Sequence, residues 1–352
     1  MTADLPLLHN SLDRLVRGLG VPAAGAGLIA VGQEPVLAVV GRRRRDRPDP
    51  VAPEDRWHIG SCCKALTALL YARLVEADRA AWGAPVAVLF PDLAAHPDWT
   101  GRTIDDLFHC RAGTPADLTG PEMAAAWRDG VPLPDQRSAV VARTLARPPG
   151  PRGRFLYSNL GYILIGAAID RIVAAEGATF ETALAAQVLR PLGITSHGFG
   201  PPPEILGHHC RFRIGPLILG RGRPADPTEA TSDNPAVMNP AGRLHLSLAD
   251  WLRLQTVFLD QPGAFLNPST MRHLLAPPSG RGLPLAMGWA HARIGGRPVL
   301  AMQGSNTLWA ATAVMDATRS RMALLIANDG RSRVLSAEAR LAAALLARAD
   351  CR

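Results

Sequence analysis

Ser61 and Lys64 are three positions apart, a spacing that places two side chains one above the other on a helix. Lys64 is the only lysine among 38 cationic residues, all others being arginine. A lysine amine can lose its proton inside a protein, whereas a guanidinium group effectively cannot. Because a serine hydroxyl is a weak nucleophile until a neighbouring group takes its proton, the pair is typical of an acyl-transfer site.

Two further motifs follow along the chain. Tyr157, Ser158 and Asn159 stand at a turn before an apolar helical stretch, and Tyr157 is one of only three tyrosines. A phenol beside a lysine ammonium can act as a general base, although such a tyrosine can equally be a packed aromatic with a satisfied hydroxyl. Residues 302–306, Met-Gln-Gly-Ser-Asn, are predicted on a strand, where glycine lets a backbone N–H group approach a ligand closely.

Hydrophobic periodicity predicts a mixed α and β chain around these motifs. Apolar spacing indicates a helix over 9–19, one that begins at Ser61, and helices punctuated by Pro and Gly from about 80 to 280, including 161–175 and 246–259. Alternation indicates two strands within 25–40 around a turn at 33–35, and strands at 288–294, 298–302, 307–315 and 321–327 before a final helix at 336–349. We therefore expect a helical segment inserted into a sheet domain.

With its motifs in this order, the sequence resembles the serine β-lactamase and penicillin-binding-protein superfamily, in its class C-like branch of esterases, DD-peptidases and transacylases. The resemblance covers roughly residues 10 to 345 and rests on Ile59-Gly60-Ser61-Cys62-Cys63-Lys64 for SxxK, Tyr157-Ser158-Asn159 for YxN and Met302-Gln303-Gly304-Ser305 for the strand motif. Supporting stretches are 103–108, 191–194 and 239–251.

The resemblance implies an α+β fold, an α/β sandwich in which helices flank an antiparallel sheet. It further implies a sheet domain of residues 1–75 and 285–352, a mostly helical domain of residues 76–284, and an active site at their interface.

The same resemblance implies a role for each motif residue. Ser61 would be acylated, with Lys64 and Tyr157 handling its proton, in an order that the sequence leaves open. Asn159 would hydrogen-bond Lys64 and position the acyl side of the substrate. The backbone N–H groups of Ser61 and Ser305 would form the oxyanion hole. Substrate contacts would come from the strand motif: Met302, Gln303, Gly304 and Asn306.

Two positions depart from the family pattern. Met302 stands where the family usually has Lys or His, and a thioether cannot pair with a carboxylate. A carboxylate-bearing substrate such as a β-lactam or a D-Ala-D-Ala stem is therefore disfavoured, unless an arginine substitutes. Cys110 stands where the family commonly has a histidine, with His109 one place earlier, a position expected to serve structure rather than chemistry.

Charge and hydropathy do not indicate a nucleic-acid or membrane partner. Much of the net charge of +8 comes from Arg42–Arg45 and Arg47, which lack interleaved aromatic residues and are expected in an exposed hairpin loop. No uninterrupted apolar run approaches the ~18 residues of a membrane helix.

Cysteine and histidine spacing predicts neither a disulfide framework nor a metal site. The cysteines are odd in number and form no CxxC pair. They are Cys62, Cys63, Cys110, Cys210 and Cys351. The adjacent histidines of His208-His209-Cys210, with His197 upstream, are expected to make structural polar contacts. The N-terminus lacks the basic and continuous apolar regions of a secretory signal. We expect a cytoplasmic protein without metal or other cofactor.

Three functions remain open at this stage. The first is a hydrolase, in which water resolves an acyl-Ser61 formed from a small-molecule ester or amide. The second is a transacylase that passes the acyl group to an amine or alcohol acceptor, and a composition rich in Arg, Ala and Pro favours a role in specialised metabolism such as antibiotic biosynthesis. The third is a non-catalytic binding scaffold. A Ser-His-Asp hydrolase is disfavoured because the chain has no GxSxG motif. The acyl donor, any acceptor and the oligomeric state are not predicted.

Overall fold

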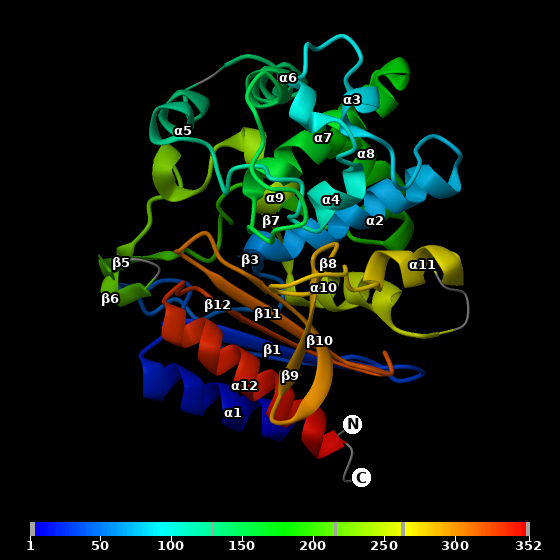
Figure 1. The fold of residues 1–352 in the computed structure, drawn as a ribbon. Coiled ribbons are helices and arrows are strands. Elements are labelled where there is room, and N and C mark those ends of the chain that lie inside the picture. The colour runs from blue at the N-terminus through cyan, green and yellow to red at the C-terminus, as the bar shows by residue number, and fades with distance from the viewer. Residues whose placement is uncertain (1–3, 129, 215–216, 262–264, 350–352) are drawn as a thin grey trace.

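The computed structural model describes residues 4–128, 130–214, 217–261 and 265–349. Helices lie on both faces of a central antiparallel sheet, with two terminal helices on one side and most of the helical segment on the other (Figure 1). This arrangement confirms the predicted fold class. Each helix in the described part of the chain is too short or too polar to cross a membrane.

The sheet has seven strands, and segments from both ends of the sequence build it. In spatial order they are β2 (Val36–Gly41), β1 (Ala23–Ala30), β12 (Arg321–Ala327), β11 (Ala310–Asp316), β10 (Arg297–Gly304), β9 (Trp289–Ile294) and β8 (Leu285–Ala286). β1 pairs with β12 from Ala24 opposite Ala327 to Ala30 opposite Arg321, which joins the two ends of the chain. These strands follow the predicted ones closely, with two exceptions. The two-residue β8 was not predicted, and β11 begins later because Thr307, at φ +78°, lies in a turn.

The two faces of the sheet bury different helices. On one face, apolar residues of β1, β11 and β12 pack with α1 (Asp4–Leu19) and α12 (Ser332–Ala349), both of which begin four or five residues before their predicted starts. On the other face lie α10 (Leu248–Gln255) and α2 (Cys63–Glu76). Almost all residues of α2 are buried. A helix that is apolar on every side is a core helix, so α2 runs through the middle of the molecule.

The inserted segment is mainly helical. Its other helices are α3 (Val86–Leu89), α4 (Ile104–Phe108), α5 (Gly120–Ala126), α6 (Leu133–Leu145), α7 (Asn159–Val173), α8 (Phe180–Leu184), α9 (Asn239–Gly242) and α11 (Pro268–Leu275). The prediction of helices throughout this segment is wrong at 208–224, where β5 (His208–Ile214) and β6 (Leu217–Pro224) form a hairpin. Helical spacing fails there because residues 210–214, Cys-Arg-Phe-Arg-Ile, have the two-residue period of a strand and Gly220 has a φ of +74°. The prediction is also wrong at 198–199 and at 244–247, which are short strands, so the helix predicted over 246–259 begins only at Leu248.

A small three-stranded sheet leads directly into the first motif. It consists of β3 (Arg56–His58), β7 (Leu244–Ser247) and β4 (Gly198–Phe199). β3 pairs antiparallel with β7, from Arg56 opposite Ser247 to His58 opposite His245. The chain therefore enters Gly60 and Ser61 from a strand whose position is already fixed.

The arginine-rich run is a loop folded against the chain's own acidic groups. An antiparallel bridge between Arg42 and Pro50 closes it. Arg43 makes two hydrogen bonds of 2.8 Å to Asp55, and Arg44 pairs with Asp46 at 2.6 Å. The expected hairpin loop is present, but these two arginines are half-buried and ion-paired.

Candidate active site

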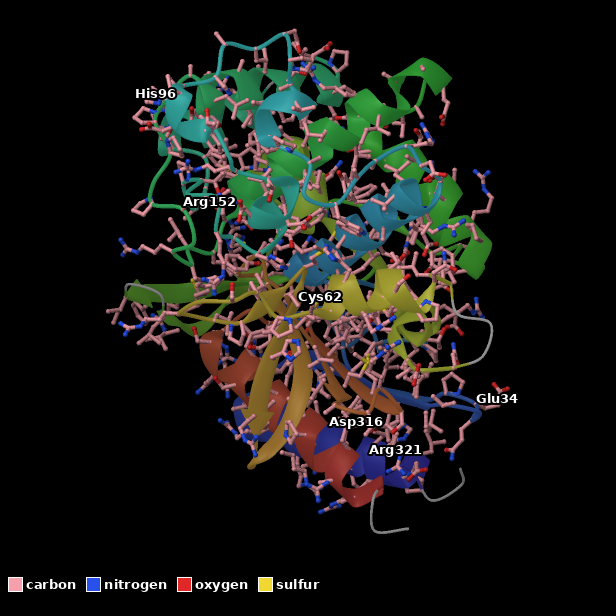
Figure 2. The ribbon with its side chains drawn as sticks, turned by 45° about the vertical axis from the view of Figure 1, so that its right-hand side comes forward. Glu34, Cys62, His96, Arg152, Asp316 and Arg321 are labelled. Atoms are coloured by element: carbon pink, nitrogen blue, oxygen red, sulfur yellow. The ribbon has the colours of Figure 1, made fainter. Side chains whose placement is uncertain are left out.

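Ser61 lies in a short 3-10 turn, Gly60–Cys62, between β3 and α2. Figure 2 shows the neighbouring Cys62 where the helices meet the sheet. Two glycines permit a very close approach of this turn to the end of β10. A Cβ on Gly60, whose φ is +52°, would lie 2.4 Å from Ser305 N, and a Cβ on Gly304 would lie 2.7 Å from Ser61 N. The N–H groups of Ser61 and Ser305 are thus brought into the same small space, as an oxyanion hole requires.

Lys64 is buried, with an exposed fraction of 1%. Its Nζ lies 3.1 Å from Ser61 Oγ, 2.8 Å from Asn159 Oδ1 and 2.6 Å from the carbonyl oxygen of Ala241. The latter two oxygens can only accept hydrogen bonds. An ammonium fills all three positions by donating, whereas a neutral amine can donate to the two fixed acceptors and accept the Ser61 hydroxyl proton. The partner set therefore accommodates both protonation states of a base.

Tyr157 borders the same cavity as Ser61 and Lys64. Its side chain is 37% exposed. Lys64 Nζ lies 4.9 Å from the centre of the Tyr157 ring and 5.2 Å from that of the buried Tyr162 ring. Both rings stabilise a positive charge on Lys64 through cation–π attraction. The structure thus brings together the three residues that the sequence predicted as nucleophile and proton carriers.

The Tyr157–Asn159 turn is held by residues 110–118. Ser158 caps α7 by accepting the Gly161 N–H at 2.9 Å, and its hydroxyl donates to Pro115 O. Asn159 Nδ2 donates to Asp117 Oδ2 at 2.9 Å. Because Asp117 accepts from the amide nitrogen, the amide oxygen of Asn159 must point the other way, toward Lys64. The sequence reasoning missed Asp117, which no motif marks.

The Ala241 carbonyl, the third partner of Lys64, belongs to α9. The position of α9 depends on a buried ion-pair network. Arg137 is fully buried and bonds Asp170 and Glu181, and Glu181 accepts from Asn239 Nδ2 at 2.9 Å. Asn239 is the first residue of α9, and Ala241 follows two positions later. If one member of a buried ion pair moves away, the charge of its partner is left buried and unpaired, which is strongly unfavourable. The network therefore strongly favours this one placement of α9.

A buried carboxylate, Asp233, connects the two segments that carry the Ser61 and Ser305 N–H groups. Its Oδ1 accepts from Asn306 Nδ2 at 2.8 Å, and its Oδ2 lies 3.1 Å from His58 Nε2. His58 Nδ1 accepts the Gly60 N–H at 3.1 Å, which leaves the Nε2 hydrogen for Asp233. Burial opposes ionisation of Asp233, but His58, Arg243 and Asn306 outweigh it and keep the pKa of the carboxyl below its usual value.

The predicted substrate-binding residues lie in different surroundings. Met302 is buried and lines the cavity that contains Ser61. The Gln303 amide donates to Thr312 Oγ1 at 3.1 Å and to Leu335 O of α12 at 2.8 Å, so its polar atoms face the α12 side of the sheet. The Asn306 side chain is occupied by Asp233 and by the turn before β11. Their contacts with a substrate remain predictions.

The cysteines near Ser61 pack as small apolar residues. Cys62 and Cys63 are fully buried, and burial raises the pKa of the Cys62 thiol strongly and that of Cys63 to about 11. Cys110 is also buried, at φ +56°. Cys351 lies outside the described residues. A buried thiol with a raised pKa has little thiolate and is therefore a poor nucleophile.

Of the two histidines at 208–209, His208 makes structural polar contacts as expected, whereas Nε2 of His209 is buried without a hydrogen-bond partner within the ranges that the structure describes. His208 is buried and lies between Arg45 N, at 3.1 Å from Nε2, and Asn328 O, at 2.8 Å from Nδ1. Burial is the main reason that the pKa of His208 falls to about 4. Among the described residues, no three His, Cys, Asp or Glu side chains gather as metal ligands would.

A model of the beta-lactamase family matches residues 11–348, which is nearly the whole chain. The chain belongs to the beta-lactamase family. Members of this family are serine hydrolases and acyltransferases, and the chain is an enzyme of this kind. No curated protein sequence is detectably similar to it.

Solved structures share this beta-lactamase fold at low sequence identity. The D-amino acid amidase of Ochrobactrum anthropi SV3, complexed with D-phenylalanine, is 20% identical with a TM-score of 0.76, over 98% of this chain and 100% of that one. A class C beta-lactamase of Rhodobacter sphaeroides is 18% identical with a TM-score of 0.75, over 97% and 98%. SurE is 23% identical with a TM-score of 0.74, over 99% of this chain and 75% of SurE. These likenesses establish the fold.

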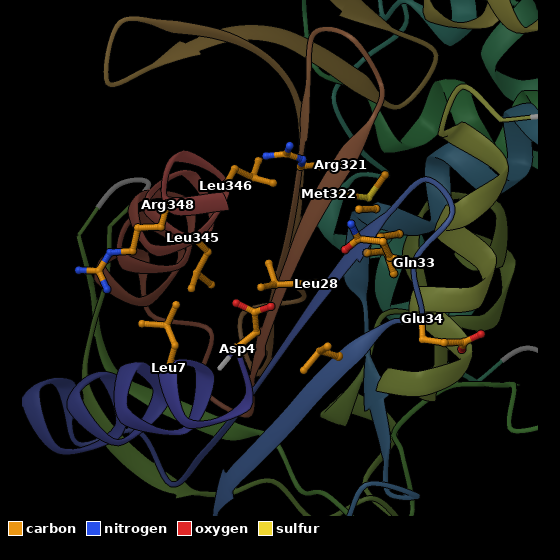
Figure 3. Close-up of a pocket in the computed structure, with 13 residues that line it drawn as sticks. Asp4, Leu7, Leu28, Gln33, Glu34, Arg321, Met322, Leu345, Leu346 and Arg348 are labelled. Atoms are coloured by element: carbon orange, nitrogen blue, oxygen red, sulfur yellow. The ribbon is translucent and has the colours of Figure 1, made fainter. Parts of the chain in front are cut away.

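A second cavity, of about 360 Å³, lies apart from this constellation. Figure 3 shows it between α1, α12 and the β1–β2 hairpin, with Leu7, Leu28 and Leu345 among the residues around it. None of the three motifs of the beta-lactamase family contributes a residue to it. The cavity that contains Ser61 is therefore the candidate active site.

Proposed function

We propose that the protein hydrolyses a small-molecule ester or amide through an acyl-enzyme intermediate on Ser61. The contact between Lys64 Nζ and Ser61 Oγ, at 3.1 Å, carries this proposal. It is supported by the two fixed acceptors, on Asn159 and Ala241, that hold the amine in place. A nucleophile with a positioned base and an adjacent pair of backbone donors contains the parts that acyl transfer needs.

In the acylation step, Ser61 Oγ forms a bond to the carbonyl carbon of the substrate. The Ser61 proton passes to the neutral amine of Lys64 or to Tyr157, and the carbonyl oxygen becomes an oxyanion between the N–H groups of Ser61 and Ser305. When the carbonyl re-forms, the bond to the leaving group breaks and the leaving alcohol or amine takes the proton. Each oxyanion donor is worth about 3 kcal/mol in such reactions.

In the deacylation step, a water molecule replaces the leaving group. Its proton passes to the same base while its oxygen attacks the acyl carbon, and the proton then returns to Ser61 Oγ as the acid leaves. Tyr157 is the partly exposed member of the constellation, so it borders the route by which water enters.

Two observations bear on the substrate class. The D-amino acid amidase named above supports the amide branch of the proposal, because it shares the fold over 98% of this chain. Met302 offers no charge to a substrate carboxylate, and Lys64, which is occupied by Ser61, is the only cation among the described residues that line the cavity. A neutral acyl donor therefore fits the site better than a β-lactam.

Intact-protein mass spectrometry tests the proposal. The protein is incubated with an activated short-chain acyl ester beside Ser61→Ala, then transferred to water alone or to a panel of amines. We expect a single acyl adduct that is absent from Ser61→Ala and that decays in water. An adduct that persists in water and disappears only with an amine would replace hydrolase by transacylase. No adduct from chemically varied donors would contradict both and favour a binding scaffold.

A further inference from the structure

The cavity that contains Ser61 extends beyond the catalytic groups. It has a volume of about 300 Å³, and its lining runs from Ser61 and Tyr157 to Ala339 on α12. α2 and α12 lie on opposite faces of the seven-stranded sheet (Figure 1). One cavity therefore reaches both faces, and it must pass around or through the sheet.

The passage lies beside the end of β10, beyond the last residue that pairs with β9. The pairing of these two strands ends at Ala301 opposite Ala290, so β10 continues to Gly304 with β11 as its neighbour. On the other strand, the chain enters β9 through Gly288, at φ +101°. A Cβ on Gly288 would lie 2.6 Å from the backbone nitrogen of Ala65, which shows that this turn packs against the start of α2. Because the chain before β9 bends at Gly288, the last residues of β10, 302–304, have no β9 partner.

The passage is apolar. Between the catalytic groups and α12 it is lined by aliphatic residues, including Leu285, Ala292, Ile294 and Ala301. The polar groups at the far end are occupied by one another, since Gln303 donates to Thr312 and Thr312 donates to Glu338. A ligand group inside it would gain free energy by leaving water and would find few polar partners.

We propose that this passage, the acyl channel, binds an extended aliphatic chain on the acyl group that Ser61 receives. The inference rests on the proposed function and adds the substrate class, a medium-chain ester or amide. The channel suits the acyl half because this half stays bound through both chemical steps. The leaving group and water must exchange with solvent, and the partly exposed Tyr157 marks the side where they can.

Chain-length dependence tests the acyl channel. With p-nitrophenyl acetate, butanoate, hexanoate and octanoate, we expect kcat/KM to rise up to about fourfold for each methylene buried. Ala301→Leu and Ala339→Leu place bulk inside the channel from the sheet and from the helix. Each should lower the octanoate-to-acetate ratio of kcat/KM at least tenfold. Ala344→Leu, an exposed position on α12, is the matched control and should keep the wild-type ratio.

The outcomes separate the two proposals. If every ester acylates Ser61 at the same rate, or if the channel variants slow all esters equally, the enzyme is a hydrolase without an acyl channel. If kcat/KM rises instead with the alcohol chain in a series of alkyl acetates, the leaving group occupies the channel and the assignment to the acyl half is wrong. If no ester forms an adduct on Ser61, both the proposed function and the acyl channel are refuted.

Discussion

Replacing Gly304 by alanine should damage catalysis through the backbone alone. The added Cβ would lie 2.0 Å from Ile59 O, 2.7 Å from Ser61 N and 2.8 Å from Cys62 N, whereas real Cβ contacts essentially never fall below 3.0 Å. All three neighbours are backbone atoms, which cannot rotate away as a side chain could. The end of β10 and the Ser61 turn must therefore separate by about 1 Å.

This separation would act on the proposed oxyanion hole, because its two N–H groups come from the two segments that are forced apart. A misplacement of about 1 Å can cost about 100-fold in rate, and loss of one oxyanion donor costs about 100- to 1000-fold in kcat. We therefore expect kcat of Gly304→Ala to fall about 100- to 1000-fold. The effect on KM should be smaller, because the donors bind the transition state more strongly than the substrate.

Release of p-nitrophenol from a p-nitrophenyl ester measures kcat, and circular dichroism at the assay temperature gives the folded fraction by which it is normalised. Gly120→Ala is the matched control, because a Cβ there has nothing within 4 Å and should leave kcat unchanged. A folded Gly304→Ala protein with kcat within threefold of wild type would refute the assignment of this contact to the oxyanion hole.

Three further predictions follow from single side chains. Lys64→Arg should keep the fold yet abolish acylation, because it preserves the charge and removes the titratable amine; a Ser61 adduct seen by mass spectrometry in this variant would disprove the role of Lys64. Asp117→Ala should lower kcat about tenfold by freeing the Asn159 amide to turn, while Asp117→Asn, which keeps an acceptor, should restore most of it; equal losses in both variants would contradict this. Burial raises the pKa of Glu338 from 4.5 to about 8. As the pH rises from 4.5 to about 8, Glu338 loses its proton in the unfolded chain before it does so in the folded protein, so the free energy of unfolding falls. Glu338→Gln should remove this fall, so that its free energy of unfolding exceeds that of wild type by on the order of 3–5 kcal/mol at pH 8 and is no higher below pH 4. Urea titrations at both pH values measure this difference, and equal stability of the two proteins at pH 8 would contradict the prediction.

The strands and helices were largely predictable because each depends on neighbouring residues. Alternation in 25–40 and 288–327 predicted β1, β2 and β9 to β12, and the apolar spacing after Ser61 predicted α2. The hairpin at 208–224 was missed. Residues 210–214, Cys-Arg-Phe-Arg-Ile, do alternate apolar and charged side chains, but this signal is only five residues long and the hairpin has no core to face, because Phe212 and Leu217 are exposed.

The site was predictable only as far as side-chain types mark it. Ser61, Lys64 and Tyr157 were found by spacing and residue chemistry, and Asn159 by the family resemblance of its motif. The carbonyl of Ala241 was not, because every residue has a carbonyl and the sequence does not say which one is aimed at an amine. Asp117 was missed for a related reason, since a carboxylate between two motifs resembles any surface acid until its partner is known.

The sequence by itself therefore determined the chemistry available to this protein: one serine with the only lysine one helical turn away, a tyrosine and an asparagine in a second motif, and a glycine-containing strand end. Tertiary structure decided which groups meet. Lys64 bonds Asn159 across 95 positions and Ala241 across 177, and His58 bonds Asp233 across 175. It also decided that the end of β10 has no β9 partner, where we propose the acyl channel. Such contacts depend on how whole helices and strands pack, whereas periodicity and residue type report only what each segment does near itself.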